Sequence, residues 1–498
     1  MSNQTGIEPA TPEQPEHAEL VGETTQRSTR YWIGVLLLLV LLSEEAAYAF
    51  SLVTPALPHM AQQFETTQIG WMFTAFQLAG MCTAPLIGKL ADAYGKRRFL
   101  LLSAAAMILG SLIVAFSPSF TVVLIGRTLE GVGIAIIPIT YSLMRDIFPA
   151  KLLALAVSIS TAGIGLTGII SPNLSGWLLD NHGYRGVFLF LAIFPAIIAA
   201  LIFAFVPESP IRVRTRIDWV GGLALGLSLA LMLLALSMGT TWGWTSPRII
   251  GSAVIGALML AAWVAYERRI DFPIMDLDLL GSRAVSTTLV ANFMAQAVIV
   301  INAVLLAYLV QTPKELGAGY GLGESATGLA HITTPAAVAS VAMGFAVGWI
   351  AQRRGPRLPA WAGFVFAAVG TGMLAFSHYS MTQLFIGNFI YAIGGGLISA
   401  AIPNLVIAAV PVAKQAVSAN VVGVFGTLGS AVGLQIAFAV LGSHVHTVIQ
   451  GNPIYADSGF KIVLILNTVF AVLGLLITFV MRHGQRPVAE EATAQLVH

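Results

Sequence analysis

Long apolar segments are the feature that most constrains the fold of this chain. A helix that crosses a bilayer needs about 20 mostly apolar residues, and fourteen such segments follow one another through the 498 residues. They lie near 31–53, 69–90, 98–117, 120–142, 153–177, 185–206, 218–238, 249–267, 285–311, 325–350, 359–376, 382–405, 416–442 and 460–481. Transmembrane β-strands would show ten-residue alternation instead. The sequence therefore predicts an all-α polytopic membrane protein.

The composition excludes several other classes of protein. Only 10% of the residues are charged, against about 25% in soluble proteins, and the mean hydropathy is +0.83. A net charge of +2 without a basic block argues against a nucleic-acid partner. The single cysteine, Cys82, excludes a disulfide framework and a cysteine-based metal site.

The placement of Lys and Arg supports the helix count and predicts the orientation. With the N-terminus in the cytoplasm, 20 of the 25 basic residues fall on the cytoplasmic side and four on the outer side. Arg127 alone lies within a helix. This bias is what the positive-inside rule requires, so we expect both termini in the cytoplasm.

An internal repeat predicts the domain organisation. The segments 88–97 and 348–357 match at an offset of 260 residues, and the pairs Ile125-Gly126 and Ile386-Gly387 match at 261. Repeats of this kind are typical of secondary transporters. We therefore expect two six-helix bundles with two helices between them. The predicted parts are a disordered tail (1–30), a first bundle (31–206), a linker with two extra helices (207–283), a second bundle (284–482) and a C-terminal tail (483–498).

The loop after the second segment carries a recognisable motif. Gly88, Asp92, Gly95, Lys96 and Arg97 resemble the signature loop between helices two and three of the major facilitator superfamily. Glycines allow a tight turn and close helix packing, and an Asp can meet a helix N-terminus or a basic group. The resemblance implies that this loop latches one conformation of a transport cycle.

The fourth segment contains Arg127 and Glu130, which resemble the Arg-x-x-Gln-Gly-x-Gly pattern of the same superfamily. A charged side chain inside a membrane is costly and usually has a partner and a function. Residues three apart lie on one face of a helix. We expect a role in proton coupling or in the substrate path, and the alternative is a buried ion pair that only holds the helix.

The fifth segment resembles the Gly-Pro-x-x-Gly-Gly signature of proton-coupled exporters, with serine in place of two glycines. Its matching residues are Gly163, Gly168, Pro172 and Gly176. Together with the helix count and the segments 218–222 and 267–277, it places the resemblance in the fourteen-helix drug:proton antiporter branch. In that branch this signature marks export, whereas small residues at this spacing also serve tight packing alone.

Two carboxylates lie midway along the first segment, at Glu44 and Glu45. An intramembrane carboxylate tends to be protonated or paired, as a proton carrier requires. Members of the branch commonly have an Asp where this chain has Ala49, and Glu45 lies one turn before it on the same face. We predict Glu45 as the leading proton site and Glu44 as the second. The alternative is that one of them pairs with Arg127 as a structural clamp.

Other polar side chains inside the segments are candidates for the substrate path. They are Gln77, Asn292, Gln296, His331, Asn404 and Asn420, with Asn302, Asn388 and Gln435 as further intramembrane amides. Such groups are expensive in a membrane unless they are hydrogen-bonded. A lone histidine such as His331 is more often a structural group than a titrating one.

These features predict a proton-coupled secondary exporter of small amphipathic or lipophilic molecules that works by alternating access. We expect a monomer in a bacterial inner membrane, with protons and small molecules as partners and without ATP, nucleic acid, metal or cofactor, because no phosphate-binding loop or catalytic motif appears. The alternatives are a dedicated exporter of one metabolite or peptide, and a sensor or scaffold that no longer transports. A membrane enzyme is disfavoured.

Overall fold

The chain is helical along almost all of the part that the computed structural model describes. This part is residues 28–213, 218–270, 277, 281–410, 415–449 and 452–486, with the backbone alone at 150, 151, 153–164, 240, 415–420, 449 and 452. The first elements are α2 (Thr29–Ser43), α3 (Glu45–Ser51), η1 (Thr54–Ala56), α4 (Leu57–Gln63), α5 (Trp71–Tyr94), α6 (Lys96–Ala115), α7 (Phe120–Gly131), η2 (Val132–Ala135), α8 (Ile136–Ile147) and α9 (Ala150–Phe205). The later ones are α10 (Trp219–Trp242), α11 (Pro247–Glu267), α13 (Arg283–Gln311), η3 (Lys314–Leu316), α14 (Ala326–Arg354), α15 (Arg357–Phe376), α16 (Met381–Ala409), α17 (Gln415–Ser443), β1 (Val445–Ile449), β2 (Asn452–Tyr455) and α18 (Asp457–Val480).

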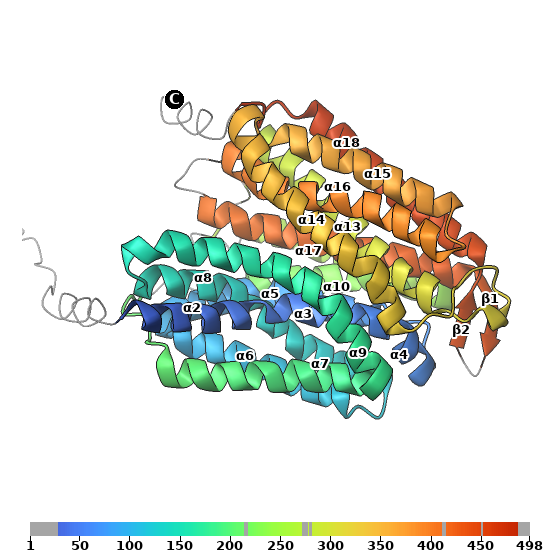
Figure 1. Cartoon of the computed structure of the whole chain (residues 1–498), viewed down its shortest axis with the longest axis horizontal. Coiled ribbons are helices and arrows are strands. Elements are labelled where there is room, and N and C mark those ends of the chain that lie inside the picture. The colour runs from blue at the N-terminus through green and yellow to red at the C-terminus, as the bar shows by residue number, and fades with distance from the viewer. Residues whose placement is uncertain are drawn as a thin grey trace, which may run out of the picture.

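The helices form two bundles that lie side by side (Figure 1). The first bundle contains α2 to α9 and the second contains α13 to α18. Between them in sequence, α10 and α11 pack against each other, and α10 contacts both α5 and α17. The predicted all-α polytopic fold is confirmed.

The predicted count of fourteen membrane helices is compatible with the described residues. Twelve described helices are long and apolar enough to cross a membrane. The helix α5 coincides with a further predicted segment. Gly183, with a φ of +63°, divides α9 into two helices, as the segments 153–177 and 185–206 predict.

Serine hydroxyls begin many of the helices. Each accepts a hydrogen bond from the backbone N–H three residues further on and so satisfies a group that the helix leaves unpaired. These serines are Ser28, Ser119, Ser246, Ser282, Ser325 and Ser380. The local sequence thus fixes where the membrane helices start.

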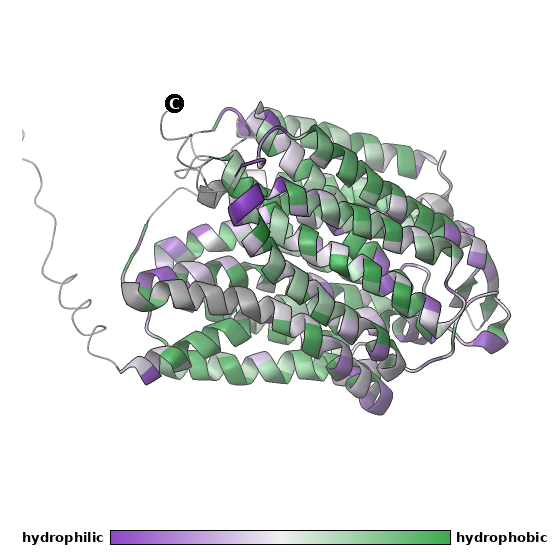
Figure 2. Ribbon diagram, turned by 45° about the horizontal axis from the view of Figure 1, so that its top comes forward, coloured by the Kyte–Doolittle hydropathy of each residue, from purple (hydrophilic) through white to green (hydrophobic). Residues whose placement is uncertain are grey.

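The surface of the bundles is apolar along the helices. Figure 2 shows hydrophobic residues over most of the helix lengths and hydrophilic residues mainly at the two ends. Large apolar side chains such as Phe203, Leu258 and Phe345 are 65–69% exposed. Exposed apolar area of this extent requires a non-aqueous surrounding, so the chain is a multi-pass membrane protein.

The two bundles share an inner end and an outer end. The inner end is where α2 begins and α9 ends, held together by the Tyr31 hydroxyl, which donates to the Phe205 carbonyl at 2.6 Å. The outer end carries η3 and an antiparallel hairpin, β1–β2, in which Val445 pairs with Tyr455. This hairpin was not predicted from the sequence. The prediction that the inner end faces the cytoplasm stays a prediction.

Candidate functional site

Arg127 lies at the centre of a polar cluster inside the first bundle. Its side chain is fully buried and forms an ion pair with Glu130, one turn further along α7. Its Nε donates to the Met72 carbonyl at 3.1 Å, and Nη2 donates to the Ala49 carbonyl at 3.3 Å. Its guanidinium carbon lies 4.6 Å from the centre of the Phe76 ring. Arg127 therefore ties α7 to α3 and α5.

Glu130 is held by a neighbouring helix as well. The Ser111 hydroxyl of α6 donates to its carboxylate. The helices α6 and α7 approach closely here, because a Cβ on Gly110 would lie 2.6 Å from the Gly126 carbonyl oxygen. The geometry contains the local ion pair that the sequence analysis gave as the alternative for Arg127. Whether the pair also takes part in transport stays a prediction.

Glu45 is a buried carboxylate that forms no ion pair with a described residue. Its side chain is 0% exposed, and neither of its oxygens has a hydrogen-bond partner among the described residues. Glu130 lies close enough for the like charges to interact, whereas Arg127 pairs with Glu130 instead. The alternative in which a glutamate of the first helix clamps Arg127 is therefore not found. A buried carboxylate without a partner is costly in its charged form.

Glu44 points to a different neighbour. It lies at the break between α2 and α3, is 4% exposed, and accepts a hydrogen bond at 2.9 Å from the Thr167 hydroxyl of α9. Adjacent helix positions are about 100° apart, so Glu45 faces the interior of the bundle while Glu44 faces α9. The helix that resembles the exporter signature is thus in direct contact with the second candidate carboxylate.

The same helix, α9, is fastened to α3 by its serines. The Ser51 hydroxyl donates to Ser171 at 2.8 Å, and the Ser175 hydroxyl donates to the Leu52 carbonyl at 2.8 Å. Serine in place of glycine in this motif therefore provides hydrogen bonds. Gly176 allows a close approach of α14, since a Cβ there would lie 2.8 Å from the Cα of Thr327.

The other residues of this motif contribute less. Pro172 lies inside α9. A Cβ on Gly168 would meet no atom within 4 Å, so packing does not require glycine there. The surroundings of Gly163 lie outside the described residues.

The predicted latch is an ion-pair cluster at the inner end. Lys96 is 3% exposed, and its Nζ lies 3.3 Å from Asp92 and in ion-pair contact with Asp146 at the end of α8. The Ser209 hydroxyl donates to Asp146 at 2.6 Å. Asp146 was not predicted from the sequence, because its partner is 50 residues away and no local motif marks it.

The turn between α5 and α6 requires glycine at position 95, the second glycine of the motif. Gly95 has a φ of +131°, which residues with a side chain rarely adopt. A Cβ there would also lie 2.8 Å from the carboxylate of Glu208. That carboxylate accepts hydrogen bonds from the N–H groups of Arg97 at 2.9 Å and Arg98 at 3.1 Å, and so caps α6. Glu208 was also not predicted from the sequence. The first glycine of the motif, Gly88, is not required by packing, because a Cβ added there would meet no atom within 4 Å.

The internal repeat is visible in the second bundle. Gly355, 260 residues after Gly95, also has a positive φ of +79°. Arg97 donates to the Phe203 carbonyl at the end of α9, and Arg357 donates to the Thr478 carbonyl near the end of α18. Each arginine thus meets the carbonyl end of the last helix of its own bundle, where a cation is favoured.

The repeat extends to the buried polar positions. Asn388, 261 residues after Arg127, is buried and accepts a hydrogen bond at 3.0 Å from Asn302. Gly370 and Gly387 form a close contact like that of Gly110 and Gly126. The second bundle thus holds an uncharged amide pair where the first holds charged groups.

His483 lies just after α18 at the inner end. Its Nε2 lies 2.9 Å from the Thr288 hydroxyl. Burial, together with the charge of Arg357, lowers the pKa of His483 to about 4. The imidazole is therefore neutral near neutral pH.

The candidate residues of the substrate path are only partly brought together. Asn292 is buried and donates to the Val422 carbonyl at 2.8 Å, and Gln435 donates to Thr74 of the first bundle at 2.6 Å. Gln77 is 8% exposed, and its carbonyl oxygen has no partner among the described residues. The role of these three residues in the substrate path stays a prediction.

The remaining candidates have different surroundings. Asn404 donates to the Ala400 carbonyl of its own helix at 2.8 Å, and Gln296 is half-buried. His331 is exposed on α14, so it does not face a shared interior. The side chain of Asn420 lies outside the described residues.

Comparison with known proteins decides the family. A model of the Major Facilitator Superfamily matches residues 46–221. The chain is 30% identical over 397 residues to Multidrug resistance protein Stp of Mycobacterium tuberculosis, which covers 79% of this chain and 72% of that protein. This chain belongs to the major facilitator superfamily. The resemblance found in the sequence is confirmed, and membership makes the chain a membrane transporter.

Two further comparisons agree with this assignment. Multidrug resistance protein 3 of Bacillus subtilis is 28% identical over 332 residues, which span 66% of this chain and 62% of that relative's length. A bacterial homologue of the human lysosomal transporter Spinster, in an inward-facing and unoccupied conformation, has a TM-score of 0.66 at 16% identity. That likeness covers 93% of this chain and 99% of the homologue, and it supports the major facilitator fold.

Proposed function

We propose that this chain is a proton-coupled exporter of small amphipathic or lipophilic molecules. It works by alternating access in a bacterial inner membrane, as a monomer with both termini in the cytoplasm and without cofactor or ATP. Relatives named multidrug resistance proteins support export of drug-like molecules. The observation that carries proton coupling is the fully buried carboxyl group of Glu45, whose oxygens have no hydrogen-bond partner among the described residues.

The chemistry of the coupling step follows from the charges around Glu45. Arg127 and Glu130 balance each other, so a proton on Glu45 leaves the cluster neutral and a lost proton leaves one net negative charge. The neutral form suits a closed interior. When the site opens outwards, Glu45 takes up a proton from the outer side. When it opens inwards, water reaches the carboxyl group, which can then release that proton.

Glu44 is placed to link this step to the substrate. Its carboxylate lies against Thr167 of α9, on the side away from the bundle interior. A cationic substrate bound near Glu44 and a proton on that carboxylate would exclude each other. Competition of this kind couples the exit of one to the entry of the other.

Efflux measurements test the proposal. The wild-type chain and its Glu45→Gln and Glu44→Gln variants would be expressed at matched levels in a bacterium without its own drug pumps. Glu315→Gln is the control, because Glu315 is an exposed carboxylate at the outer end. The panel contains lipophilic cations, anions and neutral drugs, with and without an uncoupler. We expect extrusion that stops with the uncoupler and in Glu45→Gln.

Reconstituted vesicles separate the remaining outcomes. Addition of a transported drug should release protons from the wild-type chain and not from Glu45→Gln. Drug extrusion that continues in Glu45→Gln would remove Glu45 from the coupling step. Extrusion of a single compound out of a broad panel would favour the dedicated exporter, and extrusion of none would favour the scaffold.

A further inference from the structure

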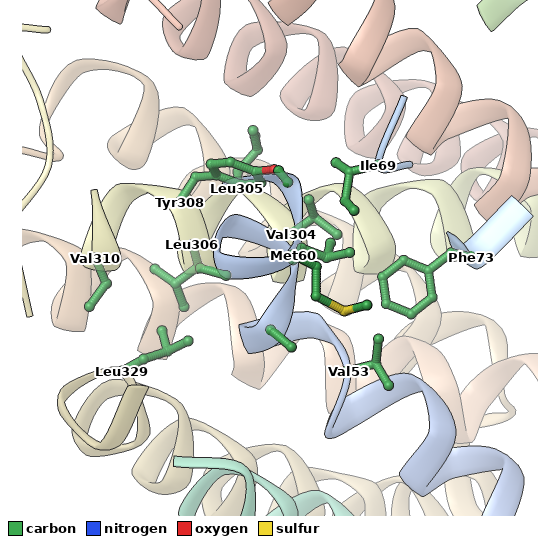
Figure 3. Close-up of a cluster of buried hydrophobic side chains, with 14 of the residues drawn as sticks. Val53, Met60, Ile69, Phe73, Val304, Leu305, Leu306, Tyr308, Val310 and Leu329 are labelled. Carbon is green, nitrogen blue, oxygen red and sulfur yellow. The ribbon is translucent and has the colours of Figure 1, made fainter. Parts of the chain in front are cut away.

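The two bundles are joined by hydrogen bonds at the outer end. Hydrogen bonds between described residues of the two bundles lie in the outer halves of the helices. They are Gln311 to the Pro55 carbonyl at 3.0 Å, Asn173 to Thr334 at 2.8 Å, Gln435 to Thr74 at 2.6 Å, and the contacts of Asp180 with Ala326 and Thr327. Apolar side chains of both bundles fill the space beside them, among them Met60 and Phe73 from the first and Val304 from the second (Figure 3).

Asp180 differs from the other contacts because it binds the end of a helix. Its two carboxylate oxygens accept the backbone N–H groups of Ala326 at 3.1 Å and Thr327 at 3.0 Å. These residues begin α14, which has 29 residues. The first N–H groups of a helix lack partners within it, and the helix dipole favours an anion there. A carboxylate of the first bundle thus caps a helix of the second.

The packing around Asp180 fits this contact. Gly176 lies four residues earlier and therefore on the same face of α9. A Cβ at Gly176 would lie within 2.8–2.9 Å of the backbone of Thr327, so any larger residue would push the start of α14 away from Asp180. His59 of α4 is close enough to interact electrostatically with Asp180.

The carboxylate of the inner latch does not join the bundles. Asp92 pairs with Lys96, and its side chain is 44% exposed. The described contacts of Asp92, Lys96 and Arg97 are made with residues of the first bundle and of the segment 206–213 that follows α9. Among the described contacts, Asp180 therefore binds the opposite bundle whereas Asp92 binds only its own.

We propose that Asp180 is the latch of the outer gate. Its carboxylate holds the N-terminus of α14 while the outer side is closed, and it must release these N–H groups each time the bundles part outwards. Gly176 sets the distance at which the latch can close. This proposal rests on the alternating access of the proposed function. In it, Asp180 positions α14 and does not touch the transported molecule.

Cysteine labelling measures the opening directly. In a Cys82→Ser background, Val304→Cys places a thiol at a position that is 1% exposed and packed between the bundles. A membrane-impermeant maleimide added from the outer side reaches it only when the gate opens. A carboxylate at a helix N-terminus shifts such an equilibrium by about two- to fivefold, so we expect Asp180→Ala to be labelled about two to five times faster. Glu315→Ala, which removes an exposed carboxylate from the same surface, should be labelled at the unchanged rate.

Cross-linking provides a second reading that does not depend on the buried thiol. Asn173→Cys with Thr334→Cys replaces a pair whose side chains touch across the seam, and its disulfide yield should fall in Asp180→Ala. Asp180→Glu should restore part of both signals. Unchanged labelling and unchanged cross-linking in Asp180→Ala would overturn the latch. Both readings need neither drug nor proton gradient, so a chain that exports nothing could still show the latch.

Discussion

Substitution of Gly95 offers a test of the turn that begins α6. Alanine cannot easily adopt the φ of +131° and ψ of 120° at this position, and such a conformation costs a residue with a side chain roughly 1–3 kcal/mol. Its Cβ would also lie 2.8 Å from Glu208. Displacement of that cap costs about 1 kcal/mol more. We therefore expect Gly95→Ala to lower the free energy of unfolding by about 2–4 kcal/mol.

Two other glycines of the repeat supply the matched variants. Gly88 is helical, and a Cβ there meets no atom within 4 Å, so Gly88→Ala should be neutral or slightly stabilising. Gly355→Ala should be at least as harmful as Gly95→Ala, because its Cβ would lie 2.4 Å from the backbone carbonyl oxygen of Gly484. Unfolding in detergent micelles, followed by the fluorescence of the nine tryptophans, measures all three. Equal losses in Gly88→Ala and Gly95→Ala would refute the reasoning.

Two further predictions concern the inner end. Asp146→Asn should lower the free energy of unfolding by about 1–3 kcal/mol, less than for a fully unpaired buried charge, because Lys96 keeps Asp92 as a partner. The added change Lys96→Met should recover part of that loss in the same unfolding assay, and no recovery would speak against the ion pair as its cause. The pKa of His483 is lowered to about 4, so its contribution to stability is complete above the ordinary pKa of about 6.5 and is lost as the pH falls towards 4. Melting temperatures between pH 7.5 and 4.5 should therefore fall less in His483→Gln than in the wild-type chain, and parallel curves would contradict this.

Much of the fold could be predicted from the sequence because membrane helices are encoded locally. The length of the apolar segments predicted the helices, and the adjacent positions of Glu44 and Glu45 account for their different neighbours. The positive φ of Gly95 is likewise permitted by the residue type, since only glycine adopts it readily. Each of these features depends on a short stretch of chain.

The partners of these residues could not be predicted in the same way. Asp146 and Glu208 meet the latch from 50 and 111 residues away, and Asp180 meets α14 across 147 residues. An acidic residue at the end of a helix has no local pattern that names its partner. The sequence left the partner of Arg127 open between Glu130 of its own helix and the two glutamates of the first helix, and only the tertiary packing decides for Glu130.

The position of α10 has a consequence for molecules that arrive from the lipid. On one side of the molecule the boundary between the bundles runs between α5 and α17, and α10 covers it by contacting both helices. On the other side the boundary runs between α9 and α14, where large side chains such as Leu166 and Phe345 are more than half exposed. Opening at the inner end would therefore create a lateral entrance from the membrane, along α9 and α14. Thr167, the partner of Glu44, directly follows the exposed Leu166 on α9, so a lipophilic molecule that enters there would pass close to the Glu44 carboxylate.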